Sequence, residues 1–75
     1  MQCTQCLVTP AASRGWTTKV GDIEYGPYLS RDMAMRIAIS EALQRRRNGV
    51  SALVVVKDAR GEVLAKRCLC AGFGR

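Results

Sequence analysis

The sequence predicts an α+β domain with the element order ββαββ, in which an antiparallel sheet of two hairpins carries one helix on one face. Three observations predict this fold. Apolar and polar residues alternate over residues 16–25, around a short turn. Apolar residues recur at helical spacing over residues 31–47. A valine-rich run then begins at residue 50 and returns, after a turn, as a second alternating segment that reaches residue 70.

The chain has 75 residues, which suits one small domain. Residues 1–14 include Pro10 and show no sustained periodicity, so we expect a flexible N-terminal arm there. We place the domain at residues 15–70 and a frayed tail at residues 71–75.

The first hairpin is indicated by Trp16, Thr18 and Val20, which share one side of an alternating segment. Gly21-Asp22 then supplies a two-residue turn, because glycine accepts the positive φ that such turns need. Proline has no N–H for a strand ladder, so Gly26-Pro27 should end the second strand.

The helix has clear start and stop signals. Ser30 is a good N-cap, and Asp32 places a negative charge in the first turn, where the helix dipole favours it. Asn48-Gly49 should stop the helix after residue 47. One stripe of this helix would face the sheet: Ala34, Met35, Ala38, Ile39, Ala42 and Leu43.

The second hairpin starts with a strand at residues 50–57 that is apolar on both faces. Asp58 and Gly61 occupy the first and fourth positions of a type I turn, and residues 62–70 return as the last strand. One helix covers only one face of the sheet, and an antiparallel sheet with one wet face normally alternates cleanly. We therefore expect that the uncovered apolar residues form a homodimer interface: Met33, Ile37, Leu53 and Val55. The alternative is that they are ordinary aliphatic residues scattered over the surface.

The cysteines form two close pairs, Cys3-x-x-Cys6 and Cys68-x-Cys70. Zinc prefers four thiolates, and the first spacing is that of a zinc knuckle. A strong zinc signature has two such knuckles about 15–20 residues apart, which this chain lacks. We expect no cofactor and reduced thiols, with zinc bound by the four cysteines as the alternative.

The sequence has few of the residues and motifs that are typical of catalytic sites. The chain has no histidine, and no nucleophile elbow, phosphate-binding loop or dinucleotide motif occurs. We therefore expect no enzyme and no small-molecule substrate. No apolar run approaches the roughly 20 residues of a membrane span. The first residues lack the features of an export signal, which predicts the cytoplasm.

The net charge of +6 arises entirely from residue 31 onward, and arginines outnumber lysines by nine to three. Arginine suits bidentate contact with phosphate, although a solvated basic surface explains the same composition. If the helix end met the second hairpin, one positive surface for nucleic acid or another anionic partner would form. Trp16, Tyr25 and Tyr28 would add base stacking if they were exposed, but Trp16 and Tyr25 alternate with the core face, which predicts that they are buried. The candidate anion-binding residues are Arg45, Arg46, Arg47, Lys57, Arg60, Lys66 and Arg67.

Residues 16–66 resemble the short bacterial proteins grouped as domain of unknown function 2188. The matching features are the Trp16-x-x-x-Val20 strand, Tyr28-x-Ser30 before the helix, the alanines at Ala34, Ala38 and Ala42, the valine-rich strand and the Asp58-x-x-Gly61 turn. This resemblance implies a compact β–helix–β module and points to no particular activity. The segment from Gly26 into the helix is also similar to the arm-binding domains of phage integrases and to plant ethylene-response DNA-binding domains. Those families place three strands before the helix, where we expect two.

Overall fold

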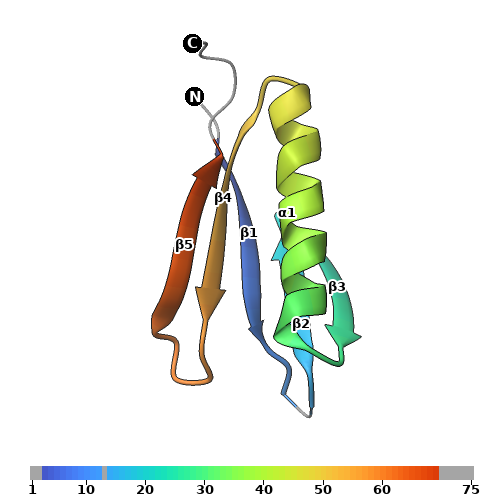
Figure 1. Cartoon of the computed structure of the whole chain (residues 1–75), viewed down its shortest axis with the longest axis vertical. Coiled ribbons are helices and arrows are strands. Elements are labelled where there is room, and N and C mark those ends of the chain that lie inside the picture. Colours follow the sequence, from blue (N-terminus) through green and yellow to red (C-terminus); the bar gives the residue numbers. More distant parts are fainter. Residues whose placement is uncertain (1–2, 13, 70–75) are drawn as a thin grey trace.

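The structure, a computed structural model, describes residues 3–12 and 14–69. The single helix follows three strands and precedes two more (Figure 1). The elements are β1 (Cys3–Pro10), β2 (Trp16–Val20), β3 (Ile23–Tyr28), α1 (Arg31–Arg47), β4 (Ser51–Lys57) and β5 (Val63–Leu69).

The strands form one five-stranded sheet in the order β3-β2-β1-β4-β5. β1 pairs with β4 in parallel, and the other three neighbouring pairs are antiparallel. The α+β class, the single helix and both hairpins are therefore confirmed. The order ββαββ and the wholly antiparallel sheet are wrong, because a fifth strand separates the hairpins and makes the sheet mixed.

That fifth strand replaces most of the flexible arm expected over residues 1–14. β1 lies at the centre of the sheet, where Cys6 pairs with Val20 of β2 and with Val54 of β4. Cys6 and Val8 are completely buried under α1. Pro10 does not disrupt the ladder, because it is the last residue of the strand. The tail expected at residues 71–75 lies outside the described residues.

Small residues let α1 lie close to the sheet. Ala34, Ala38 and Ala42 are completely buried at the contact. The buried Thr18 hydroxyl of β2 donates a hydrogen bond of 2.7 Å to the carbonyl oxygen of Ala34. This bond satisfies the one buried polar side chain of the described core. The strands contribute the other buried residues of this core: Cys6, Val8, Val20, Ala52, Val54 and Val56.

The helix begins and ends where its caps predict. The Ser30 hydroxyl accepts a hydrogen bond of 3.2 Å from the N–H of Met33, which satisfies a donor of the first turn. At the other end, the N–H of Asn48 donates to the carbonyls of Gln44 and Arg45. Gly49 follows with a φ of +82°, a conformation that favours glycine.

The turn of the second hairpin forms at the residues that the sequence predicts. Asp58 accepts hydrogen bonds of 2.9 Å from the N–H groups of Arg60 and Glu62, and the Gly61 N–H donates to the Asp58 carbonyl. β3 does not end at Gly26-Pro27 but continues to Tyr28. Proline is tolerated there because β3 is an edge strand, where one row of backbone groups needs no partner.

Candidate functional site

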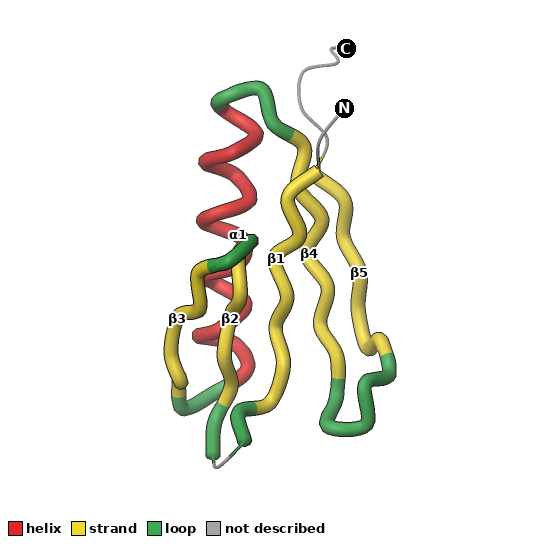
Figure 2. The backbone as a smooth tube through the Cα atoms, turned by 180° about the vertical axis from the view of Figure 1, so that it is seen from behind, coloured by secondary structure: helices red, strands yellow, loops and turns green. Residues whose placement is uncertain are grey.

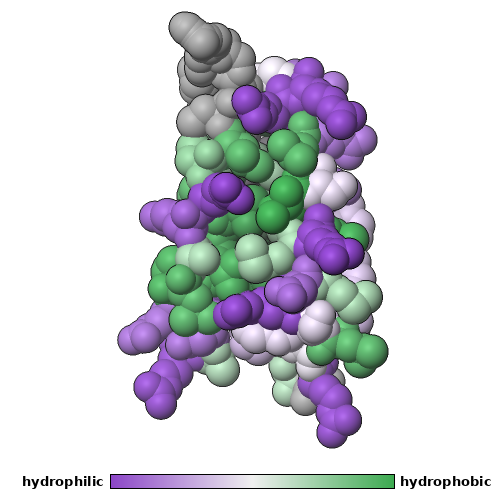
Figure 3. Space-filling model, viewed as in Figure 1, coloured by the Kyte–Doolittle hydropathy of each residue, from purple (hydrophilic) through white to green (hydrophobic). Residues whose placement is uncertain are grey.

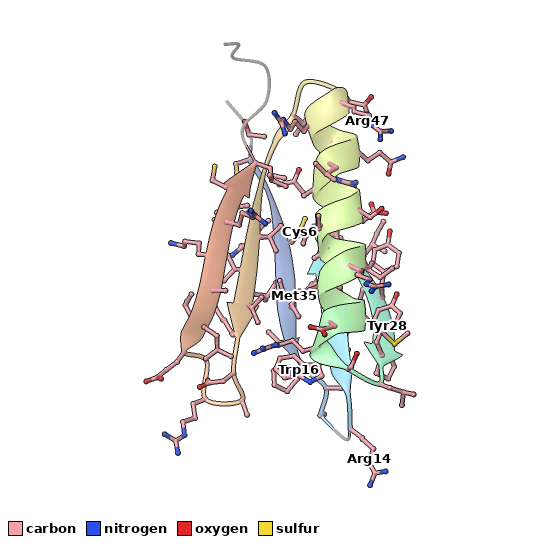
Figure 4. All side chains as sticks on the ribbon, in the orientation of Figure 1. Cys6, Arg14, Trp16, Tyr28, Met35 and Arg47 are labelled. Carbon is pink, nitrogen blue, oxygen red and sulfur yellow. The ribbon has the colours of Figure 1, made fainter. Side chains whose placement is uncertain are left out.

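The helix covers the sheet unevenly. Five strands spaced about 4.8 Å apart make a sheet about 19 Å wide between its edge strands, whereas a helix is about 10 Å across. α1 packs mainly on β1, β4 and β2, and Figure 2, seen from behind, shows no described element over the opposite face. On the β3 flank, the gap beside the helix is filled by two tyrosines of β3 that pack against the core, Tyr25 and Tyr28, of which Figure 4 labels Tyr28.

The β5 flank is filled less completely. Figure 4 shows Trp16 on that side of α1, below Met35, and a groove of about 240 Å³ remains between the helix and β5. Figure 3 shows an apolar surface in this region, bordered by hydrophilic side chains. Met35 lies on the side of the helix that faces this groove (Figure 4). The groove is lined by Met35 and Ile39 of α1, Val54 and Val56 of β4, and Ala65, Lys66 and Arg67 of β5.

The border of the groove at β5 is basic. Arg67 pairs with Val54, a core residue under the helix, so its side chain rises on the helix side of β5. The described part of the chain contains one ion pair, between Arg45 and Glu41 at 2.7 Å. No described carboxylate therefore neutralises Arg67. An apolar groove with a basic border is the result.

β5 is also an exposed edge strand. Its residues are exposed from Val63 to Cys68, and Val63 and Leu64 keep 51% and 49% of their surface in contact with solvent. An edge strand presents unpaired backbone groups that invite another chain, and charged side chains discourage such pairing. Lys66 and Arg67 place charges at the middle of this edge, one on each face of the sheet.

The predicted anion-binding residues do not form one surface. Arg45, Arg46 and Arg47 lie in the last turn of α1, and Arg45 is already engaged by Glu41. Figure 1 shows the turn between β4 and β5 at the opposite end of the molecule from that helix end. The other predicted residues are therefore scattered: Lys57 and Arg60 beside that turn, and Lys66 and Arg67 on opposite faces of β5.

The aromatic residues are not displayed for base stacking. Trp16, Tyr25 and Tyr28 are half-buried between the helix and the sheet. The guanidinium carbon of Arg31 lies 6.0 Å from the centre of the Trp16 ring, which places a cation over that ring.

The predicted dimer residues also fall on two surfaces. Met33 and Ile37 belong to α1, whereas Leu53 and Val55 point to the opposite, uncovered face of the sheet. Val55 is only 2% exposed and therefore offers almost no surface to a partner. A single interface cannot contain all four residues.

Cys3 and Cys6 do not form a zinc knuckle in the described structure. Cys3 and Cys6 lie on one strand, at positions that point to opposite faces, so Cys6 is completely buried while Cys3 is exposed. Burial raises the pKa of the Cys6 thiol, which disfavours the thiolate that zinc requires. Among residues 3–12 and 14–69, no group of three potential metal ligands occurs. Cys70 lies outside the described residues.

The groove itself was missed at the sequence level. The sequence predicts that Met35 and Ile39 face the sheet. They lie beside the sheet and line the groove, whereas the neighbouring alanines of the helix are completely buried against the strands. The sequence offers two signals for this groove. Ala65 has a small side chain and Arg67 a charged one, so neither can fill the groove as the tyrosine rings fill the β3 flank.

No family model matches this chain, and neither a curated protein nor a solved structure is significantly similar to it. The resemblance to domain of unknown function 2188 therefore stays a prediction. Within the described residues, no helix has both the length and the apolar character needed to cross a bilayer.

Proposed function

We propose that this chain is a non-enzymatic binding module that holds an acidic, partly apolar segment of another protein in the groove between α1 and β5. The observation that supports this proposal is the groove itself, which combines an apolar floor with the unneutralised Arg67 at its border. Apolar contacts would supply most of the affinity, and the charge would select the partner.

The charge of the molecule favours an acidic partner. The chain carries +6, and a surplus of this size attracts anionic partners over distances of about 8–10 Å at physiological salt. Nucleic acid would use the same charge, but phosphate binding needs clustered cations, and the seven predicted residues are scattered. The apolar floor would gain nothing from a phosphate backbone. Nucleic acid is therefore the alternative that the experiment must separate.

A second copy of the chain is a poorer occupant than an acidic partner. It would bring the same +6 charge to the groove. Antiparallel pairing of two β5 edges about their central residue would place Lys66 opposite its own copy, and like charges directly opposite destabilise a sheet. Self-association through β5 is consequently disfavoured.

The test is a titration of the ¹⁵N-labelled chain followed by amide chemical shifts. The first probe is a peptide of leucine and glutamate, and its control carries lysine in place of glutamate. DNA and RNA oligonucleotides are the other probes. We expect the acidic peptide to shift Met35, Ile39, Ala65 and Arg67, and the basic peptide to shift none of them.

Two results would contradict the proposal. One is the absence of groove shifts at millimolar acidic peptide. The other is salt-sensitive binding of an oligonucleotide, which would restore nucleic acid as the partner. Light scattering of the chain alone would detect a homodimer, and a stable dimer that buries the groove would also overturn the proposal.

A further inference from the structure

We infer that the partner segment binds as an amphipathic α-helix that lies beside α1, over β4 and β5. This inference rests on the proposed function and adds the conformation and the place of the partner. It follows from the width of the sheet, the origin of the groove-lining side chains and the position of the charge.

The dimensions leave room for one more helix. The sheet is about 19 Å wide between its edge strands, and neighbouring helices pack about 8–10 Å apart, so a second helix beside α1 would cover the part of the sheet face that α1 leaves open. The seven residues of β5 extend over about 23 Å, the length of a helix of about 15 residues. A second helix would complete the two-layer arrangement in which a sheet face is normally covered.

The groove-lining side chains favour a helix over an added strand. Met35 and Ile39 reach the groove from α1, above the plane of the sheet. A strand added to the edge of β5 would lie in that plane and would leave these two side chains uncovered. A helix resting on Ala65 would contact both layers, because alanine permits the close approach that Ala38 already permits for α1.

The charge fixes which side of the partner helix is acidic. Arg67 rises from β5 on the helix side, at the border of the groove farthest from α1. A partner with apolar residues three and four positions apart would place them toward α1 and the sheet. Its acidic residues would follow on the flank above β5, within reach of Arg67.

The experiment uses a peptide of about 15 residues, the length derived above, with leucines at helical spacing and glutamates on one flank. A second peptide has the same sequence except for two central prolines, which prevent a continuous helix. Affinity is measured by fluorescence anisotropy, and circular dichroism reports whether the peptide becomes helical on binding. Both peptides are tested against the intact chain.

Two pairs of variants locate the peptide. Ala65→Trp fills the groove, whereas Gln5→Trp puts the same ring at an exposed position on the opposite face of the sheet. Arg67→Glu reverses the charge at the groove, whereas Arg60→Glu makes the same change in the distant turn. We expect each groove variant to weaken binding about tenfold or more, a difference of about 1.4 kcal/mol. The controls should bind like the parent chain, and all four should retain its circular dichroism spectrum.

The outcomes separate the inference from the proposed function. Helical binding that both groove variants weaken supports the inference. Equal binding of the proline peptide, or binding without gain of helicity, contradicts the inference that the partner is helical. The proposed function, an acidic segment bound in the groove, would still stand. Equal effects of Ala65→Trp and Gln5→Trp overturn the location. If neither acidic peptide binds, the proposed function fails as well.

Discussion

At the scale of single residues, the contact between helix and sheet depends on a few small buried side chains. Thr18 is the buried polar member of the described core, and its hydroxyl bonds the Ala34 carbonyl at 2.7 Å. Cys6 lies on the neighbouring strand and is completely buried. Each of these residues has a property that a substitution or a change of pH can test.

Replacing Thr18 with valine should destabilise the fold by about 1 kcal/mol, because it removes a buried hydrogen bond while keeping the shape of the side chain. Urea unfolding measures the change. Thr17→Val, on the opposite face of β2, is the control; its hydroxyl makes only long, partly exposed contacts of 3.4 and 3.5 Å with Thr9, so its loss should alter stability by less than about 0.5 kcal/mol. An unchanged or higher stability of Thr18→Val would show that the hydroxyl contributes nothing.

The thiol of Cys6 should make stability depend on pH in the alkaline range. Burial raises its pKa above the usual value of 9.0, so the folded state holds the proton more tightly than the unfolded chain does. The contribution of the protonated thiol to the free energy of unfolding is complete below pH 9.0 and is lost as the pH rises through the folded-state pKa. Cys6→Val should therefore lose less stability than the parent chain between neutral pH and pH 10. Parallel curves for the two proteins would contradict this assignment.

At the scale of elements, the decisive feature is the central position of β1. It joins the two hairpins into one sheet, with antiparallel pairing to β2 and parallel pairing to β4. The parallel partner follows only after the first hairpin and the helix. β1 therefore contributes to the fold through contacts that are distant in the sequence.

A proline in the middle of β1 should unfold the protein. Val8 is completely buried and pairs with Thr18 on one side and Val56 on the other. Val8→Pro removes a ladder donor from a central strand, at a cost of about 3 kcal/mol or more. Ala59→Pro is the control, because the second position of a type I turn favours proline. Circular dichroism and thermal unfolding measure both; a flexible arm would tolerate the two changes equally.

The elements that the sequence predicts well are those with local signals. Ser30 and Asn48-Gly49 mark the helix ends, and Gly21 and Gly61 lie in the turns of hairpins whose strands are neighbours in the chain. β1 has no such signal: Leu7 is apolar on the uncovered face, while Cys6 lies in the core. Its alternation becomes visible only when both partner strands are known. The dimer and zinc hypotheses stay predictions. Both depend on which face each side chain takes, and Met33 and Leu53, like Cys3 and Cys6, lie on different faces.

At the scale of the whole molecule, one helix is too narrow for the sheet that it covers. Tyr25 and Tyr28 cover the β3 flank, whereas the β5 flank keeps an open apolar groove. The groove depends on the relative placement of α1, β4 and β5, so no local pattern predicts it. The net charge of +6 is visible in the sequence, but its division between separate surfaces is not.

The most direct measurement of the central claim is a set of intermolecular nuclear Overhauser effects between the labelled chain and the acidic leucine-rich peptide. The account predicts contacts from the peptide leucine methyls to the side chains of Met35, Ile39 and Ala65. Contacts to Leu7 and Leu53 on the uncovered face instead, or none to the groove at saturating peptide, would contradict it.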